Sequence, residues 1–299
     1  PLRPSFAEGF RCETHIVATS LAVDGEQAFD VIALNGASAA LSVSPIPFEG
    51  PLGGVRVALK KGEWIPFPTA TELEESVFEL TVAGHRNDSG EIDITMVEAG
   101  ATPNGLRLIA EGDQPSDEET VARGLEESKQ YIAQMIDLQL ELASQVDIPE
   151  VEFPRAVDYS DEIYSKVDAA GSARVADAIR IAGKHERQDA EREAFDAVVA
   201  ELGIAEDDAD ALKEAKNAFR SLFKKMARQR VIEEGVRLDG RGLTDVRPIS
   251  VEVAVIPRTH GSALFQRGET QVLNVTTLGM LKMEQMLDTL ANEESKRYM

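Results

Sequence analysis

The chain has 299 residues, a net charge of −22 and a single cysteine. Its hydrophobic content of 43% is enough for about two domain cores, which excludes a wholly disordered chain. One cysteine excludes a disulfide framework and any site that needs several thiolates. No apolar run is long enough to span a bilayer. These properties favour a cytoplasmic protein that does not enter the membrane.

The negative charge is unevenly distributed along the chain. Residues 1–220 contain 19 basic and 43 acidic side chains, whereas residues 221–299 contain 12 basic and 10 acidic ones. A nucleic-acid channel needs a locally basic lining rather than a basic whole. The overall charge therefore neither supports nor excludes RNA as a ligand.

The first half of the sequence predicts a sheet covered by helices. Alternation over residues 11–24 predicts a strand that ends in a turn at Asp24-Gly25. The small apolar residues of 29–43 predict a helix packed closely against a sheet. Alternating apolar residues between turn signals predict further strands at 53–59, 64–67, 80–84 and 92–97. Ser116 and Glu119 form a possible capping box, which predicts the start of a long helix.

The middle of the sequence predicts a linker followed by helices. Residues 145–160 contain two prolines and are typical of a linker. Residues 160–232 are rich in Ala, Glu, Lys and Arg, which predicts several helices with breaks near Gly171, Gly183 and Gly203. The pattern then returns to strands, at 249–255, 263–265 and 271–277. This order predicts an α/β (α+β) fold with two mixed units around a helical insert.

Three stretches carry a resemblance to a known family. They are residues 237–241 (RLDGR) with 246–249 (VRPI), residues 257–271 (PRTHGSALFQRGETQ), and residues 1–4 (PLRP) with 35–40 (NGASAA). Together they resemble bacterial polynucleotide phosphorylase over essentially the whole chain. The resemblance implies two RNase PH-like cores, both truncated here, joined by an all-helical domain. Its expected parts are the C-terminal part of the first core (1–145), the linker and helical domain (146–232), and the N-terminal part of the second core (233–299).

The resemblance also implies an activity. The family degrades single-stranded RNA from the 3′ end by phosphorolysis, an mRNA-turnover reaction that uses inorganic phosphate and Mg²⁺ and releases nucleoside diphosphates. It further implies a homotrimer and RNA-degradation proteins as partners. The family's catalytic and metal-binding residues are expected beyond Met299, so we expect none in this chain, which we interpret as an internal piece of a longer protein. Because guanidinium groups suit phosphate, the expected RNA-binding residues are Arg3, Arg258 and Arg267.

The first core departs from the family's active pattern at the positions that can be compared. The metal-binding aspartates are matched by Glu79 and, further back, by Leu73, and the nearby lysine is matched by Thr81. The phosphate-binding serines correspond to Phe29 and Asp30. A hard cation prefers more than one carboxylate, and Asp30 would repel phosphate. We therefore expect this core to build the ring and channel without catalysing phosphorolysis, and these residues give no support to the guanosine polyphosphate synthesis credited to some relatives.

Plain structural roles stay open for several residues. Arg258, His260 and Arg267 are also suited to capping strand ends or pairing with nearby carboxylates, namely Asp239, Asp245 and Glu269. Basic residues late in the last helix form a stripe that faces either RNA or the acidic body of the protein; they are Lys224, Lys225, Arg228 and Arg230.

Two other functions also stay open. One is a single-core hydrolytic or tRNA-trimming enzyme of the same superfamily, against which the helical insert argues. The other is a non-catalytic RNA-binding scaffold in which both cores are degenerate.

Overall fold

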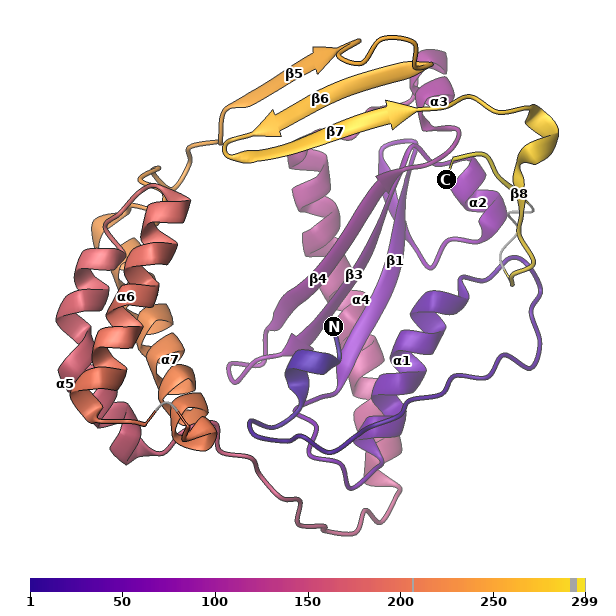
Figure 1. The fold of residues 1–299 in the computed structure, drawn as a ribbon. Helices are drawn as coiled ribbons and strands as arrows, with labels where there is room; N and C mark the ends of the chain where they lie inside the picture. The colour runs from indigo at the N-terminus through magenta and orange to yellow at the C-terminus, as the bar shows by residue number, and fades with distance from the viewer. Residues whose placement is uncertain (206, 291–294, 299) are drawn as a thin grey trace. The chain divides into compact units, whose positions relative to one another are not determined.

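The computed structural model describes residues 1–205, 207–290 and 295–298. It divides into two compact units, Pro1–Ala156 with Gln285–Met299, and Val157–Glu284 (Figure 1). Helices and antiparallel sheets make up both units, so the predicted α+β fold class is confirmed. The domain boundaries drawn from the sequence, after residues 145 and 232, stay a prediction.

The first unit is built on a four-stranded antiparallel sheet in the order β2-β1-β3-β4. Its strands are β1 (Leu52–Lys60), β2 (Glu63–Pro66), β3 (Phe78–Arg86) and β4 (Ile92–Ala101). All four were predicted from alternation in the sequence. Side chains of β1 and β3 such as Val55, Leu80 and Val82 are fully buried and form the core of the unit.

Helices pack against this sheet through close backbone approaches (Figure 1). They are α1 (Phe29–Ser42) and α4 (Glu118–Ser144). The unit also contains the shorter helices η1 (Arg3–Ser5), α2 (Ala70–Glu74) and α3 (Gly105–Glu111). The Asn35 side chain of α1 donates to the Gly54 carbonyl and accepts from the Gly54 amide, both at 2.9 Å. A Cβ added to Gly53 would lie 2.4 Å from the Ile132 carbonyl oxygen of α4, so glycine is what allows this helix to reach β1. The close packing predicted for residues 29–43 is confirmed.

Two predictions for this unit are wrong in detail. Residues 11–24 lie in no strand, and Leu21 is 93% exposed, although the turn at Asp24-Gly25 is present, with the Asp24 carboxylate accepting from the Glu26 amide. The alternating pattern is real, but among the described residues no strand pairs with it. The long helix is capped by Asp117, whose side chain accepts from the Thr120 amide at 2.8 Å, rather than by Ser116.

The second unit begins with three helices. They are α5 (Asp161–Ala178), α6 (Lys184–Leu202) and α7 (Ala209–Glu234). Gly183 precedes α6 and Gly203 ends it in the left-handed region at φ +67°, as predicted. The predicted break at Gly171 is wrong, because this glycine lies inside α5. A Cβ there would be 3.2 Å from Val198 of α6, so the small residue serves close helix packing.

The rest of the second unit is a three-stranded antiparallel sheet. Its strands are β5 (Ile249–Val253), β6 (Gly261–Arg267) and β7 (Thr270–Thr276), in that order. Each matches a strand predicted from the sequence. The other short elements are η2 (Leu281–Met283) in this unit, and β8 (Gln285–Met286) paired with β9 (Ser295–Lys296) in the first.

The predicted linker and the predicted absence of a membrane span can both be compared with the structure. Residues 145–160 lie between α4 and α5 and contain no helix or strand, apart from an isolated bridge between Arg155 and Phe10. None of the helices in the described parts of the chain combines the length and the apolar character needed to cross a bilayer.

Candidate nucleic-acid interface

Two of the three arginines predicted to bind RNA lie at opposite ends of β6. Arg258 is in the loop that leads into the strand, and Arg267 is its last residue. A strand rises by about 3.3 Å per residue, so the two ends of the seven-residue strand β6 lie roughly 20 Å apart. The structure therefore places the two arginines near opposite ends of β6 and not in one cluster.

Both arginines have exposed side chains. Within the described residues neither Arg258 nor Arg267 forms an ion pair, so the alternative that they pair with Asp239, Asp245 or Glu269 is wrong. Arg258 has a backbone φ of +68°, in a region that residues other than glycine rarely adopt. An arginine held in a costly backbone conformation, with its charge left free, is consistent with a binding role rather than a packing role.

The loop that carries Arg258 is fixed by local hydrogen bonds. The Ser262 hydroxyl accepts from the Ile256 amide at 2.9 Å, and Thr259 donates to the Ile256 carbonyl at 3.1 Å. His260 Nδ1 accepts from the Leu278 amide at 2.8 Å, so this histidine ties the loop to the segment after β7. The structural alternative for His260 is thus supported, while Arg258 is left facing solvent.

The third predicted arginine belongs to the other unit. Arg3 lies in the short helix η1 and is exposed, and it forms no ion pair within the described residues. Its role in RNA binding stays a prediction.

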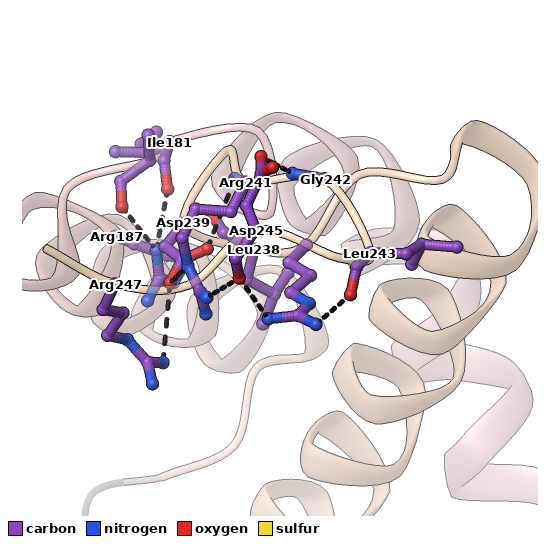
Figure 2. A network of polar contacts seen from close by, with 11 residues as sticks. Ile181, Arg187, Leu238, Asp239, Arg241, Gly242, Leu243, Asp245 and Arg247 are labelled. Carbon is purple, nitrogen blue, oxygen red and sulfur yellow. Dashed lines mark hydrogen bonds and ion pairs between the residues drawn. The ribbon is translucent and has the colours of Figure 1, made fainter. Parts of the chain in front are cut away.

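A polar network centred on Asp239 follows the last helix (Figure 2). The predicted Asp-Gly-Arg turn is present: Gly240 has a φ of +82°, and the Arg237 amide donates to the Arg241 carbonyl at 2.8 Å. Arg241 Nε donates to the Asp239 carboxylate at 2.9 Å, and Arg247 lies 3.5 Å from the same group. Burial alone would raise the pKa of Asp239, but the Arg241 hydrogen bonds and the two positive charges outweigh it and lower that pKa.

Other arginines of this network bind main-chain carbonyls. Arg187 of α6 donates to the carbonyls of Ile181, Ala182 and Leu238 at 2.9–3.2 Å (Figure 2). Arg237 donates to the carbonyls of Leu243 and Asp245. These hydrogen bonds to main-chain carbonyls hold the loop in shape, and Arg247, with a side chain 47% exposed, is the arginine of the network most open to a ligand.

Two of the positions that depart from the family's active pattern meet at one arginine. Asp30 lies in the first turn of α1, Glu79 lies on β3 and Arg56 lies between them on β1. One terminal guanidinium nitrogen of Arg56 donates a hydrogen bond to the Glu79 carboxylate at 3.0 Å, and the other donates to the Asp30 carboxylate at 2.5 Å. The Arg56 side chain is only 21% exposed. The two carboxylates that the sequence comparison singled out are therefore engaged by a guanidinium.

This arrangement does not fit a metal or phosphate site. A cation would have to displace Arg56 from both carboxylates, and phosphate would meet a cluster of two negative charges and one positive charge. Elsewhere in the described ranges, no group of three or more His, Cys, Asp or Glu side chains is placed to hold a metal ion.

Sequence reasoning missed Arg56. Its one signal is position, because it is the only charged residue inside a strand whose neighbours Val55 and Val57 are fully buried. A charged group in such surroundings requires a partner, but the sequence does not state which elements adjoin β1.

Comparison with known proteins extends the resemblance to the whole chain. Residues 162–242 match the family model described as "Polyribonucleotide nucleotidyltransferase, RNA binding domain". All 299 residues align with proteins of the name polyribonucleotide nucleotidyltransferase, at 48% identity in Nocardioides sp. and at 49% in both Thermobifida fusca and Acidothermus cellulolyticus. The chain spans about two fifths of these curated relatives, or 38–40% of their length.

The fold and the matched family model together define the class of this chain. It is an α+β chain whose helical part corresponds to an RNA-binding domain. Over all of its residues it is similar to proteins named polyribonucleotide nucleotidyltransferase, and the resemblance noted in three stretches of the sequence is confirmed.

Proposed function

We propose that the protein to which this chain belongs degrades single-stranded RNA from the 3′ end by phosphorolysis. The observation that carries the proposal is the similarity of the chain, over its full length, to proteins named polyribonucleotide nucleotidyltransferase, at 48–49% identity. The matched RNA-binding domain over 162–242 supports the same substrate class.

In this reaction inorganic phosphate takes the place of water. A phosphate oxygen attacks the phosphorus of the last phosphodiester, the bond from that phosphorus to the O3′ of the preceding nucleotide breaks, and this O3′ takes up a proton. The terminal nucleotide then leaves as a nucleoside diphosphate. A divalent cation, Mg²⁺ in our proposal, would neutralise the phosphoryl oxygens. Since the described residues do not fit a cation site, carboxylates other than these would have to hold it.

The part of this chain in the reaction is RNA binding. Arg258 and Arg267 are exposed, form no ion pair within the described residues and lie near opposite ends of one strand, which suits contacts to successive parts of an extended RNA backbone. Arg3 is proposed for the same role in the first unit. The Asp30–Arg56–Glu79 cluster supports a structural role for the first core, as part of a ring and channel.

The proposed setting follows the family. We propose a homotrimer, RNA-degradation proteins as partners and the cytosol as the compartment. The single free cysteine is consistent with a reducing compartment.

The test is RNA degradation by the intact protein in Mg²⁺, with and without inorganic phosphate. Nucleoside diphosphates that appear only with phosphate are the expected product. Nucleoside monophosphates released without phosphate would indicate hydrolysis and overturn the proposal. RNA that is bound but never shortened would indicate the non-catalytic scaffold.

A further inference from the structure

Helix α7 carries an unusual charge distribution for this acidic protein. Residues 215–232 contain six basic side chains and no acidic one, whereas the chain as a whole has 31 basic and 53 acidic side chains. The segment lies inside the range matched to the RNA-binding domain. A local excess of this kind needs an explanation in the geometry of the helix.

Five basic residues lie on one face of α7, and we call them the α7 stripe. They recur every three or four residues: Lys213, Lys216, Arg220, Lys224 and Arg228. Residues at this spacing are neighbours on a helix surface. With a rise of 1.5 Å per residue, the stripe is about 22 Å long and has one positive charge roughly every 6 Å.

Every member of the α7 stripe has an exposed side chain. The opposite face of the helix, including Ala218, Phe219 and Leu222, is buried against α5 and α6 and holds the stripe outward. Across the part of the chain that the structure describes, none of the five makes an ion pair or a side-chain hydrogen bond. The alternative from the sequence, that basic residues of this helix face the acidic body of the protein, stays a prediction.

Other basic residues of the same unit do have partners within it. On the same helix Arg230 binds Glu234 at 3.0 Å and the Ile179 carbonyl, and Lys225 lies 6.0 Å from the centre of the Tyr164 ring. On α5, Lys166 pairs with Glu162 at 2.6 Å. The stripe differs from these side chains because none of its five residues has an ion-pair or hydrogen-bond partner in the part of the chain that the structure describes.

We propose that the α7 stripe binds the sugar–phosphate backbone of single-stranded RNA. A line of evenly spaced cations matches the line of charges on an extended strand, and free cations release counterions without first losing a partner in the protein. The stripe contains no aromatic residue on which a base could stack, so the contact should be independent of sequence. This inference rests on the proposed function, because it assumes that RNA is the ligand.

The first experiment compares two triple variants of the intact protein, which remove equal charge from the same unit. One is Lys216→Gln, Arg220→Gln and Lys224→Gln in the stripe. The matched control, on exposed positions of α5 and α6, is Lys166→Gln, Lys184→Gln and Arg192→Gln. Binding of a fluorescent single-stranded oligoadenylate is measured from 50 to 200 mM salt, and circular dichroism checks that each variant is folded.

The expected result is a change in salt dependence for the stripe variant only. For single strands each phosphate contact contributes about 0.7 to the slope of log K against log salt, so losing three contacts reduces the slope by about 2. Over this fourfold salt range the affinity of the wild type should fall about 20-fold more than that of the stripe variant. The control should keep the wild-type slope.

Three outcomes separate the possibilities. A stripe variant with the wild-type slope overturns the proposal, and if its sedimentation is also altered the stripe is a protein interface instead. A wild type that binds RNA but releases no nucleoside diphosphate would refute phosphorolysis, while the slopes would still test the stripe. If the variant does not fold, acetylation footprinting of the wild type decides: RNA should protect Lys213, Lys216 and Lys224 but not Lys166 or Lys184, and equal modification overturns the proposal.

Discussion

The Arg56 cluster of the first unit and the α7 stripe of the second use positive charge in opposite ways. Arg56 is 21% exposed and bound to two carboxylates, whereas the five stripe residues are exposed and bound to none that the structure describes. The first arrangement occurs at positions where the sequence departs from the family's active pattern, and the second occurs on a helix where the sequence predicts a basic stripe that faces either RNA or the acidic body.

The difference follows from where each charge lies. Arg56 is on a strand between buried valines, where an unpaired guanidinium would lose its hydration without compensation. The stripe is on the outer face of a helix, where water solvates each ammonium and guanidinium group. A buried cation is therefore fixed by the fold, and an exposed line of cations stays available to a ligand.

The largest effect on stability is expected from Arg56→Gln. The variant leaves Asp30 and Glu79 facing each other without a cation, which should destabilise the first unit by about 2 kcal/mol, below the range for fully buried pairs because the cluster is partly solvated. Trp64, the only tryptophan, is buried in this unit, so its fluorescence during urea unfolding reports the loss. The matched variant Arg220→Gln, on the stripe, should change stability by less than about 0.5 kcal/mol.

A double-mutant cycle sharpens this prediction. Adding Glu79→Gln to Arg56→Gln removes one of the two repelling carboxylates and should restore part of the lost stability. If Arg56→Gln alone leaves the urea midpoint unchanged, the contrast between a fixed and a free cation is wrong.

The next effect concerns Asp239, which holds Arg241 and Arg247. Asp239→Asn should destabilise the 237–242 turn by roughly 1 kcal/mol, after a discount for its partial exposure, because charge-assisted hydrogen bonds become neutral ones. The pKa of Asp239 is lowered in the folded protein. The ionised carboxylate therefore stabilises the turn fully above about pH 4, the pKa in the unfolded chain, and this stabilisation is lost as the pH falls through the lower pKa of the folded protein. Hydrogen-exchange protection of the Gly240 amide, measured against pH, checks both effects.

The variant also provides its own control. In Asp239→Asn the protection should no longer fall with this acid transition, although the protein is less protected at neutral pH. A variant that keeps the wild-type acid dependence would show that another group holds the turn.

Most elements of the fold could be predicted from local pattern alone. The strands of both sheets follow from alternation, and α1 and the three helices of the second unit follow from composition. The errors arise where local pattern depends on a distant partner. Residues 11–24 have the alternating pattern of a strand, but no strand among the described residues pairs with them. Gly171 marks a close helix contact rather than a break, because Val198 lies against it.

The candidate site was less predictable than the fold. The sequence singled out Glu79 and Asp30 as departures from the family pattern, yet their partner Arg56 became visible only when α1, β1 and β3 were adjacent. It also grouped Lys225 and Arg230 with Lys224 and Arg228 as one stripe. Helical geometry separates them, because neighbouring residues point about 100° apart.

Backbone strain at Arg258 gives a smaller effect. Its φ of +68° is favourable for glycine and unfavourable for alanine, so Arg258→Gly should be more stable than Arg258→Ala by about 1 kcal/mol. Both variants lose the same guanidinium, so RNA affinity should fall equally in the two. Thermal unfolding and RNA titration of the pair measure these effects separately. Equal stability would show that the loop relaxes, and unequal RNA affinity would show that loop shape rather than charge sets binding.

The smallest effect separates two adjacent lysines. Lys224→Gln should reduce the salt slope of RNA binding by about 0.7 and leave stability within about 0.5 kcal/mol of the wild type, because this residue belongs to the α7 stripe. Lys225→Gln should leave the slope unchanged and lose up to about 0.5 kcal/mol, because its ammonium lies over the Tyr164 ring. The two variants have the same net charge and differ only in the helix face they alter. Equal slopes would mean that RNA responds to the charge of the helix rather than to its outer face.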